Sequence, residues 1–212
     1  MRSSGTIDKL KWRYATKKFD SSRKLSEDKI RVLKEAFNLT ATSYGLQPLK
    51  MVVISDQDIK EKLMEYTYYQ PQVRDASHVL VLCIEREIDA SFIVEHFKRV
   101  EAIRKTSRDI LEPYEQNLIA TFSEKEKEEI KVWMTNQLYL TLGALLTVCA
   151  IEKIDSCAME GFQPEKYDAF LGLDKRGLES VIVLPVGYRD TSDFFSNLKK
   201  VRRGVDELII EL

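Results

Sequence analysis

The sequence is poor in the residue types that build metal centres and disulfide frameworks. Its two histidines, His78 and His96, lie far apart and have no cluster of acids or thiols beside them. The three cysteines, Cys83, Cys149 and Cys157, are odd in number and form no C-x-x-C motif. We therefore expect no metal site, and we expect reduced thiols in a cytoplasmic protein.

The sequence also lacks an excess of charge of one sign and a long apolar segment. Lys and Arg number 33 against 34 Asp and Glu, so no overall basic field exists to bind nucleic acid, and an anion site must be local. Residues 1–5 lack the apolar stretch of a signal peptide, so none is expected. The apolar run 138–151 is too short to span a bilayer, so we expect no membrane partner. Such a run, apolar all round, is expected to be buried on every side, either in the centre of the domain or at a subunit interface.

What is present is an alternation of amphipathic helices and β-branched strands. The chain is long enough for one domain, residues 1–212, with a charged helical excursion at about 88–122. Ser26 and Asp56 are expected to cap helices, and Ser123 with Glu126 to open a long helix through a capping box. Strands are expected at 49–54, 78–84 and 180–187. The apolar tail 205–210 is expected to join a sheet edge, in its own subunit or in another. The alternation predicts a three-layer α+β or α/β sandwich.

A short basic segment, Arg13-Tyr14-Ala15-Thr16-Lys17-Lys18-Phe19, is the strongest candidate for a binding site. Arg13 offers a planar fork of donors and Lys17 a compact charge, a pairing that suits a phosphate or another oxyanion. The alternative is a basic helix end, because cations complement the carbonyl pole of a helix. A second basic cluster, residues 199–203, lies near the other end of the chain, and the two clusters are candidates to converge.

Four features are read together in chain order: residues 13–19, Ala41-Thr42-Ser43 with Gln47-Pro48, Asp75-Ala76-Ser77-His78, and Glu160-Gly161-Phe162 with Pro185-Val186-Gly187-Tyr188. In this order they resemble the bacterial nitroreductase family of FMN-dependent NAD(P)H oxidoreductases, in its oxygen-insensitive nitroreductase and dihydropteridine reductase-like subgroup. The resemblance implies an α+β, nitroreductase-like three-layer α/β/α sandwich with a mixed central sheet. It also implies a homodimer that exchanges its C-terminal strand and holds the flavin at the subunit interface.

The resemblance also implies which residues bind the flavin. Arg13, Lys200 and Arg202 would grip the FMN phosphate, and Lys17 would approach the pyrimidine side of the ring. The remaining implied FMN contacts are Tyr14, Ala15, Thr16, Gln72, Glu160 and Gly161, either Tyr69 or Gln70, and, from the partner subunit, Ala41, Thr42, Ser43 and Gly45. Tyr44, Tyr68 and Glu160 are implied to line the substrate pocket.

The activity implied by the resemblance is ping-pong hydride transfer from NADH or NADPH, through flavin N5, to a small-molecule electron acceptor. Nitroaromatics, quinones and pterins are the implied acceptors. Because the flavin carries the chemistry, no catalytic side chain is expected. Flavin reductase or dehalogenase-like chemistry on the same scaffold is one alternative, and a flavin-binding storage or sensor protein without turnover is another.

Overall fold

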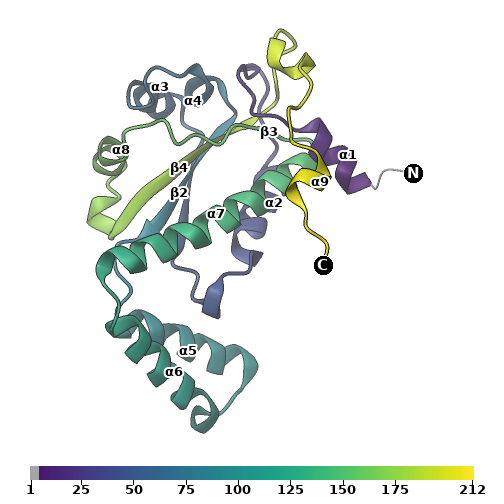
Figure 1. Cartoon of the computed structure of the whole chain (residues 1–212). Helices are drawn as coiled ribbons and strands as arrows, with labels where there is room; N and C mark the ends of the chain where they lie inside the picture. Colours follow the sequence, from purple (N-terminus) through teal and green to yellow (C-terminus); the bar gives the residue numbers. More distant parts are fainter. Residues whose placement is uncertain (1–4) are drawn as a thin grey trace.

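The computed structural model describes residues 5–212, and the prediction of no signal peptide concerns a segment that lies almost wholly outside them. Figure 1 shows a central sheet flanked by helices, with both ends of the chain near one side of it. The helices are α1 (Gly5–Trp12), α2 (Glu27–Leu39), α3 (Gln57–Glu65), α4 (Pro71–Asp75), α5 (Ala90–Arg104), α6 (Arg108–Ser123), α7 (Lys127–Ile151), α8 (Pro164–Leu171) and α9 (Val205–Leu208). The strands are β1 (Leu49–Ile54), β2 (His78–Glu85), β3 (Asp155–Ser156) and β4 (Leu178–Gly187), and the 3-10 turns are η1 (Ser43–Gly45), η2 (Asp174–Arg176) and η3 (Phe194–Asn197).

The sheet is antiparallel, which corrects the expectation of a mixed sheet. Its strand order is β1-β2-β4-β3, and each of the three pairings runs antiparallel. Within the described residues, the parallel pairing is confined to the isolated bridge between Ala15 and Ser156. The apolar runs did not reveal the strand direction, because a strand covered on both faces reads alike in parallel and antiparallel sheets.

The layers follow from the alternation of side chains along β2. Leu80 and Leu82 face one apolar cluster, whereas Val79 and Val81 face another. All four side chains are fully buried, so the prediction of a strand covered on both faces is confirmed. The layers meet the sheet through Leu33, Leu138 and Leu145 of α2 and α7 on one face, and through Leu63, Val73 and Tyr167 of α3, α4 and α8 on the other.

Helix starts are only partly those predicted. Ser26 and Asp56 cap α2 and α3 by accepting backbone N–H groups, as expected. The predicted capping box at Ser123 is wrong, because α6 continues through this residue and its hydroxyl donates to a carbonyl within α6. Glu126 and Glu129 form the reciprocal box that begins α7 instead. The N-cap residue of α7 is therefore a glutamate, whereas the predicted capping box had serine at this position.

The long helix α7 crosses one face of the sheet (Figure 1). Leu138 and Leu145 are fully buried, but Tyr139 and Leu140 are 40% and 56% exposed in the single chain. Burial of this second face at a subunit interface stays a prediction. Within the described residues, α7 is the helix whose length and composition would allow it to cross a membrane. Its buried face packs into the core of the domain, as expected of a central helix in a folded layer.

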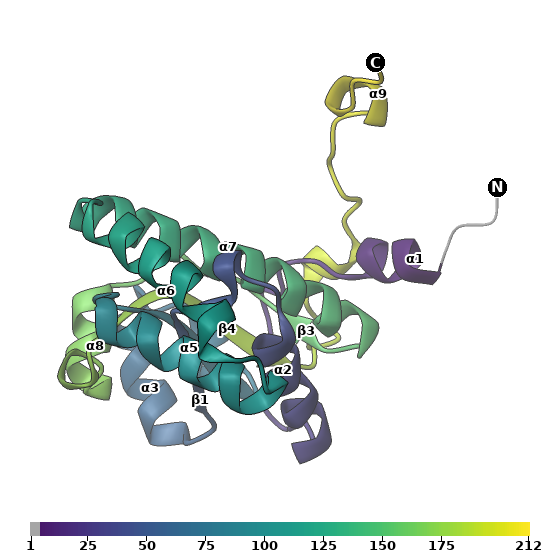
Figure 2. The ribbon, with the colours of Figure 1, turned by 90° about the horizontal axis from the view of Figure 1, so that it is seen from below.

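Two parts of the chain stand away from the sheet. The pair α5 and α6 packs together beyond one end of α7 (Figure 1). Figure 2 shows the segment after η3 leaving the body as an arm that ends in α9. The tail 205–210 is therefore not a strand over its first part, because Val205–Leu208 form a helical turn. Residues 209–212 form no strand with the described residues, and the Ile209 amide donates to the Val205 carbonyl at 2.9 Å. The single-domain assignment stays a prediction.

Candidate functional site

The basic segment near the N-terminus leaves α1 and runs beside β3. Ala15 forms a bridge with Ser156, and the Thr16 amide donates to the Ser156 carbonyl at 3.2 Å. Thr16 is fully buried, whereas Lys17 is exposed. The extended backbone thus turns successive side chains to opposite sides of the sheet edge. Because α1 ends at Trp12, Arg13 lies just past the helix and the segment beyond it is not helical.

The cationic cluster consists of Arg13, Lys200 and Arg202, drawn from opposite ends of the chain. The Lys200 ammonium donates to the Arg13 carbonyl. Burial, followed by the charges of Arg13 and Arg202, lowers the pKa of Lys200. Burial also lowers the pKa of Arg13, and Arg202 contributes in the same direction. None of the three forms an ion pair with an acid of the described residues, so the cluster is suited to an anion.

The cluster is connected to the rest of the site through Asp193, a residue that sequence reasoning missed. Its Oδ2 accepts hydrogen bonds from the Tyr14 hydroxyl at 2.7 Å and from the Lys17 and Lys18 amides at 2.9 and 3.0 Å. Burial acts to raise the pKa of this carboxyl, but the hydrogen bonds led by that of Tyr14 outweigh it, and the pKa is lowered. The bonding pattern joins positions far apart in the sequence, so no local motif marked it.

A second group lies where the chain passes from β3 towards α8. The Gln70 amide nitrogen donates to the Gly161 carbonyl at 2.9 Å, while Tyr69 is 70% exposed. Of these two candidates, the structure therefore brings Gln70 to Gly161. The Tyr139 hydroxyl donates to Glu160 at 2.6 Å, and this bond, with burial, raises the pKa of Tyr139 to about 12. Tyr139 was missed because it lies inside an apolar helix.

Buried polar atoms without a partner test whether this part of the molecule suits a cofactor. Arg13 Nε, Thr16 Oγ1 and Gln72 Oε1 are buried and have no hydrogen-bond partner among the described residues. Arg13 and Thr16 belong to the basic segment and Gln72 to α4. Buried polar groups are ordinarily satisfied, so unpaired donors and acceptors on residues named for the flavin site are consistent with ligand binding there. A phosphorylated, heteroaromatic cofactor such as FMN offers both an anion and ring acceptors and donors, so the residues fit it.

The loop 41–45 lies elsewhere in the single chain. The Ser43 amide donates to Gln137 Oε1 at 2.8 Å, and Gly45 lies against the ring of His96. These contacts tie the loop to α7 and α5 rather than to the cationic cluster. Contact of Ala41, Thr42, Ser43 and Gly45 with a partner's flavin therefore stays a prediction.

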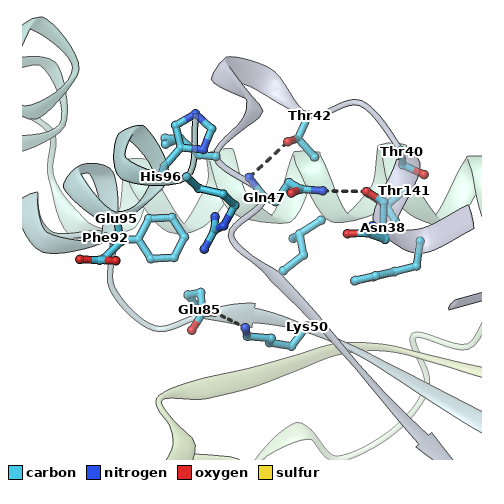
Figure 3. A pocket seen from close by; sticks show the side chains of 14 residues that line it. Asn38, Thr40, Thr42, Gln47, Lys50, Glu85, Phe92, Glu95, His96 and Thr141 are labelled. Atoms are coloured by element: carbon cyan, nitrogen blue, oxygen red, sulfur yellow. Dashed lines mark hydrogen bonds and ion pairs between the residues drawn. The ribbon is translucent and has the colours of Figure 1, made fainter. Parts of the chain in front are cut away.

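A cavity of about 330 Å³ opens beside this loop (Figure 3). Thr42 lines it and accepts the Gln47 amide at 3.3 Å, and Glu85 across the cavity pairs with Lys50 at 3.7 Å. Burial lowers the pKa of His96, which stands at the upper wall of the cavity in Figure 3. Among the described residues no group of three or more metal-ligating side chains occurs.

Tyr44 and Tyr68, expected in a substrate pocket, and Tyr69, a candidate flavin contact, are exposed and hold unusual backbone conformations. Tyr44, Tyr68 and Tyr69 are 45%, 62% and 70% exposed, with φ of 58°, 53° and 59°. Tyr44 packs its ring edge against Phe122 and lies near Trp133. Left-handed backbone in bulky residues is strained, and such strain concentrates at functional loops.

Comparison with known proteins gives a consistent match. The sequence pattern of the Nitroreductase family matches residues 10–188. An oxygen-insensitive NAD(P)H nitroreductase of Salmonella typhimurium is 28% identical over 208 residues, covering 94% of this chain and 96% of its own. The major NAD(P)H-flavin oxidoreductase of Aliivibrio fischeri is 30% identical over 214 residues, covering 96% of both chains. A chain from Exiguobacterium sibiricum, solved in complex with FMN, superposes with a TM-score of 0.83 at 16% identity, covering 100% of this chain and 99% of its own.

Proposed function

Because this chain belongs to the nitroreductase family, we propose that it is an NAD(P)H-dependent oxidoreductase that binds FMN and reduces small acceptors. The names of the Salmonella and Aliivibrio relatives, which span nearly the whole chain, support this reaction class. The FMN-bound relative supports the choice of cofactor.

The observation that carries the proposal is the convergence of Arg13, Lys200 and Arg202. Like charges repel at close range, so gathering them without an acid costs free energy. An FMN phosphate would offset that cost and take forked hydrogen bonds from the guanidinium groups. The unpaired Arg13 Nε supports the same assignment.

The remaining residues would bind and orient the ring. Gln72 and Thr16 each offer an unpaired buried oxygen, and Gly161 offers backbone beside Gln70. The Lys17 ammonium forms no ion pair with the described residues, which leaves it to hold positive charge beside the ring. When bound, FMN supplies the redox chemistry, taking a hydride from NAD(P)H and passing two electrons to the acceptor in separate half-reactions. The chain therefore needs no nucleophile or general base of its own.

We propose further that the protein is a homodimer with the flavin at the subunit interface. The outward face of α7 exposes Tyr139 and Leu140, and the arm after η3 exposes Val201, Val205 and Ile210 at 88%, 72% and 85%. An arm with this much apolar surface needs a partner surface, and exchange of residues 209–212 between subunits would provide one. Cytoplasmic location is part of the same proposal, supported by the three free, buried cysteines.

Purified protein tests the proposal directly. FMN should bind at one per chain and shift its visible spectrum, and anaerobic NADH or NADPH should then bleach it. Protein that gains no flavin spectrum would refute the FMN site. Protein that binds FMN and is bleached by neither nucleotide would favour the storage or sensor alternative.

The electron acceptor would be identified by assaying the second half-reaction, in which the reduced flavin is reoxidised. Anaerobic turnover against matched nitroaromatics, quinones and pterins would rank the three classes by kcat/KM. Turnover confined to free flavin would favour the flavin reductase alternative, and halide release from a halogenated aromatic would favour the dehalogenase-like one.

A further inference from the structure

We propose that Asp193 is a positioning residue that makes the site selective for a phosphorylated flavin. This inference rests on the proposed FMN site and concerns a residue that would not touch FMN itself. Asp193 is 2% exposed, and it begins η3, seven residues before Lys200.

The first argument is the number of bonds that one carboxylate makes to the basic segment. Oδ2 accepts from the Tyr14 hydroxyl and from two successive amides, those of Lys17 and Lys18. Oδ1 accepts the Phe195 amide at 3.1 Å. The same side chain therefore fixes both the backbone after Arg13 and the turn that leads to the C-terminal cations.

The second argument concerns where an anion would bind without Asp193. Two successive amides pointing at one acceptor form a small anion-binding concavity. In this protein the Asp193 carboxylate fills the concavity made by Lys17 and Lys18. An external phosphate is therefore left with the cationic cluster of Arg13, Lys200 and Arg202 as its site.

The third argument is electrostatic. A buried carboxylate that accepted no hydrogen bonds would compete for the cations of the cluster. Here Tyr14, the two amides and Phe195 satisfy the Asp193 carboxylate, and no ion pair joins it to a cation of the described residues. Asp193 thus orders the segment without neutralising the charge that the phosphate requires.

The experiment compares FMN with riboflavin, which carries the same ring without the phosphate. Dissociation constants for both are measured by quenching of flavin fluorescence on titration with protein freed of flavin. The ratio of the riboflavin constant to the FMN constant reports the phosphate contribution alone. A general loss of structure weakens both flavins alike and leaves this ratio unchanged.

We expect Asp193→Asn to lower the ratio by about tenfold or more, because a side-chain amide cannot accept from all of these donors. Tyr14→Phe, which removes one donor and keeps the carboxylate, should lower the ratio by about threefold. Asp190→Asn is the matched control. Asp190 lies in the same turn, where its carboxylate accepts from Ser192 and lies 4.0 Å from the exposed Lys18 ammonium. It accepts none of the Asp193 hydrogen bonds, so Asp190→Asn should leave the ratio unchanged.

The possible outcomes distinguish failure of the proposed FMN site from failure of the proposed role of Asp193. Wild-type protein that fails to bind FMN refutes the cofactor assignment. Wild-type protein that prefers FMN while Asp193→Asn keeps the wild-type ratio refutes only the role of Asp193. If Asp193→Asn does not fold, the Tyr14→Phe ratio decides, and an unchanged ratio there overturns the inference.

Discussion

Lys60 is a buried lysine without an ion-pair partner among the described residues. Its burial predicts an unusual dependence of the free energy of unfolding on pH. Its side chain is fully buried, and its ammonium donates to the Ala76 and Ser77 carbonyls at 2.7 and 3.5 Å. Burial, and to a smaller extent the charge of Lys24, lowers its pKa from 10.5 to about 8.

The sign follows from proton counting. The lowered pKa of Lys60 means that the unfolded chain holds a proton that the folded chain has released between about pH 8 and pH 10.5. The free energy of unfolding therefore rises with pH across that window. At about 1.4 kcal/mol per pKa unit, the charged lysine costs the fold about 3 kcal/mol below the window, and most of this cost is gone at about pH 10.

The assay is urea unfolding of the wild type and Lys60→Met at about pH 7 and about pH 10. Methionine keeps the length of the chain and removes the proton, so the stability of the wild type relative to this variant should improve by about 2 to 3 kcal/mol from the lower pH to the higher. His78, which lies near Lys60, is neutral throughout this range because burial lowers its pKa further. Lys62→Met, on the exposed side of the same helix, is the control and should show no such improvement. A difference between wild type and Lys60→Met that stays constant or shrinks with pH would refute the reasoning.

Three further predictions concern the phosphate site, a crowded glycine and the arm. Arg202→Ala should weaken FMN binding about tenfold through loss of a charge-assisted bond, and flavin retention equal to wild type on a desalting column would contradict this. Gly187→Ala should lower the free energy of unfolding by about 1 to 3 kcal/mol, because an added Cβ would lie 3.0 Å from the Ser77 amide nitrogen. Gly143→Ala, with nothing within 4 Å, is its control and should not destabilise in thermal melts. Deleting residues 204–212 should shift the protein from dimer to monomer in light scattering, and an unchanged mass would remove the arm from the interface.

Much of the fold was predictable because its causes are local. The β2 strand is a continuous apolar run whose alternate residues pack against two helical layers. Asp56 is a helix-capping residue type at the position where α3 begins after β1. Prediction failed where two local signals competed. Ser123 has the sequence of a cap, yet α6 extends over it, and Glu126 caps α7 instead. It failed again over the first part of the tail 205–210, where Val205–Leu208 form a helical turn in an arm that joins no strand of the described chain.

The site was predictable only in part, since its geometry depends on contacts between distant segments. Arg13 and Lys17 could be named from their residue types. The predicted convergence of the two basic clusters is seen in the Lys200–Arg13 hydrogen bond, whereas the grouping of Lys17 with Lys200 stays a prediction. Asp193 and Tyr139 could not be named, because a turn aspartate and a helix tyrosine gain significance only from partners that the sequence does not identify.

The cationic cluster implies that cofactor binding and order at the C-terminus are coupled. Arg13 and Lys200 are 187 residues apart in sequence, and each is held where burial and like charges lower its pKa. Arg13 follows α1, whereas Lys200 and Arg202 follow η3 by three and five residues, in the first part of the arm. Repulsion within the cluster therefore opposes docking of that part of the arm. An anion bound between them reverses the sign of this interaction, and a ligand that binds only the docked arrangement stabilises it by mass action. Because the proposed dimer interface continues along the same arm, FMN and the partner subunit should each strengthen the binding of the other.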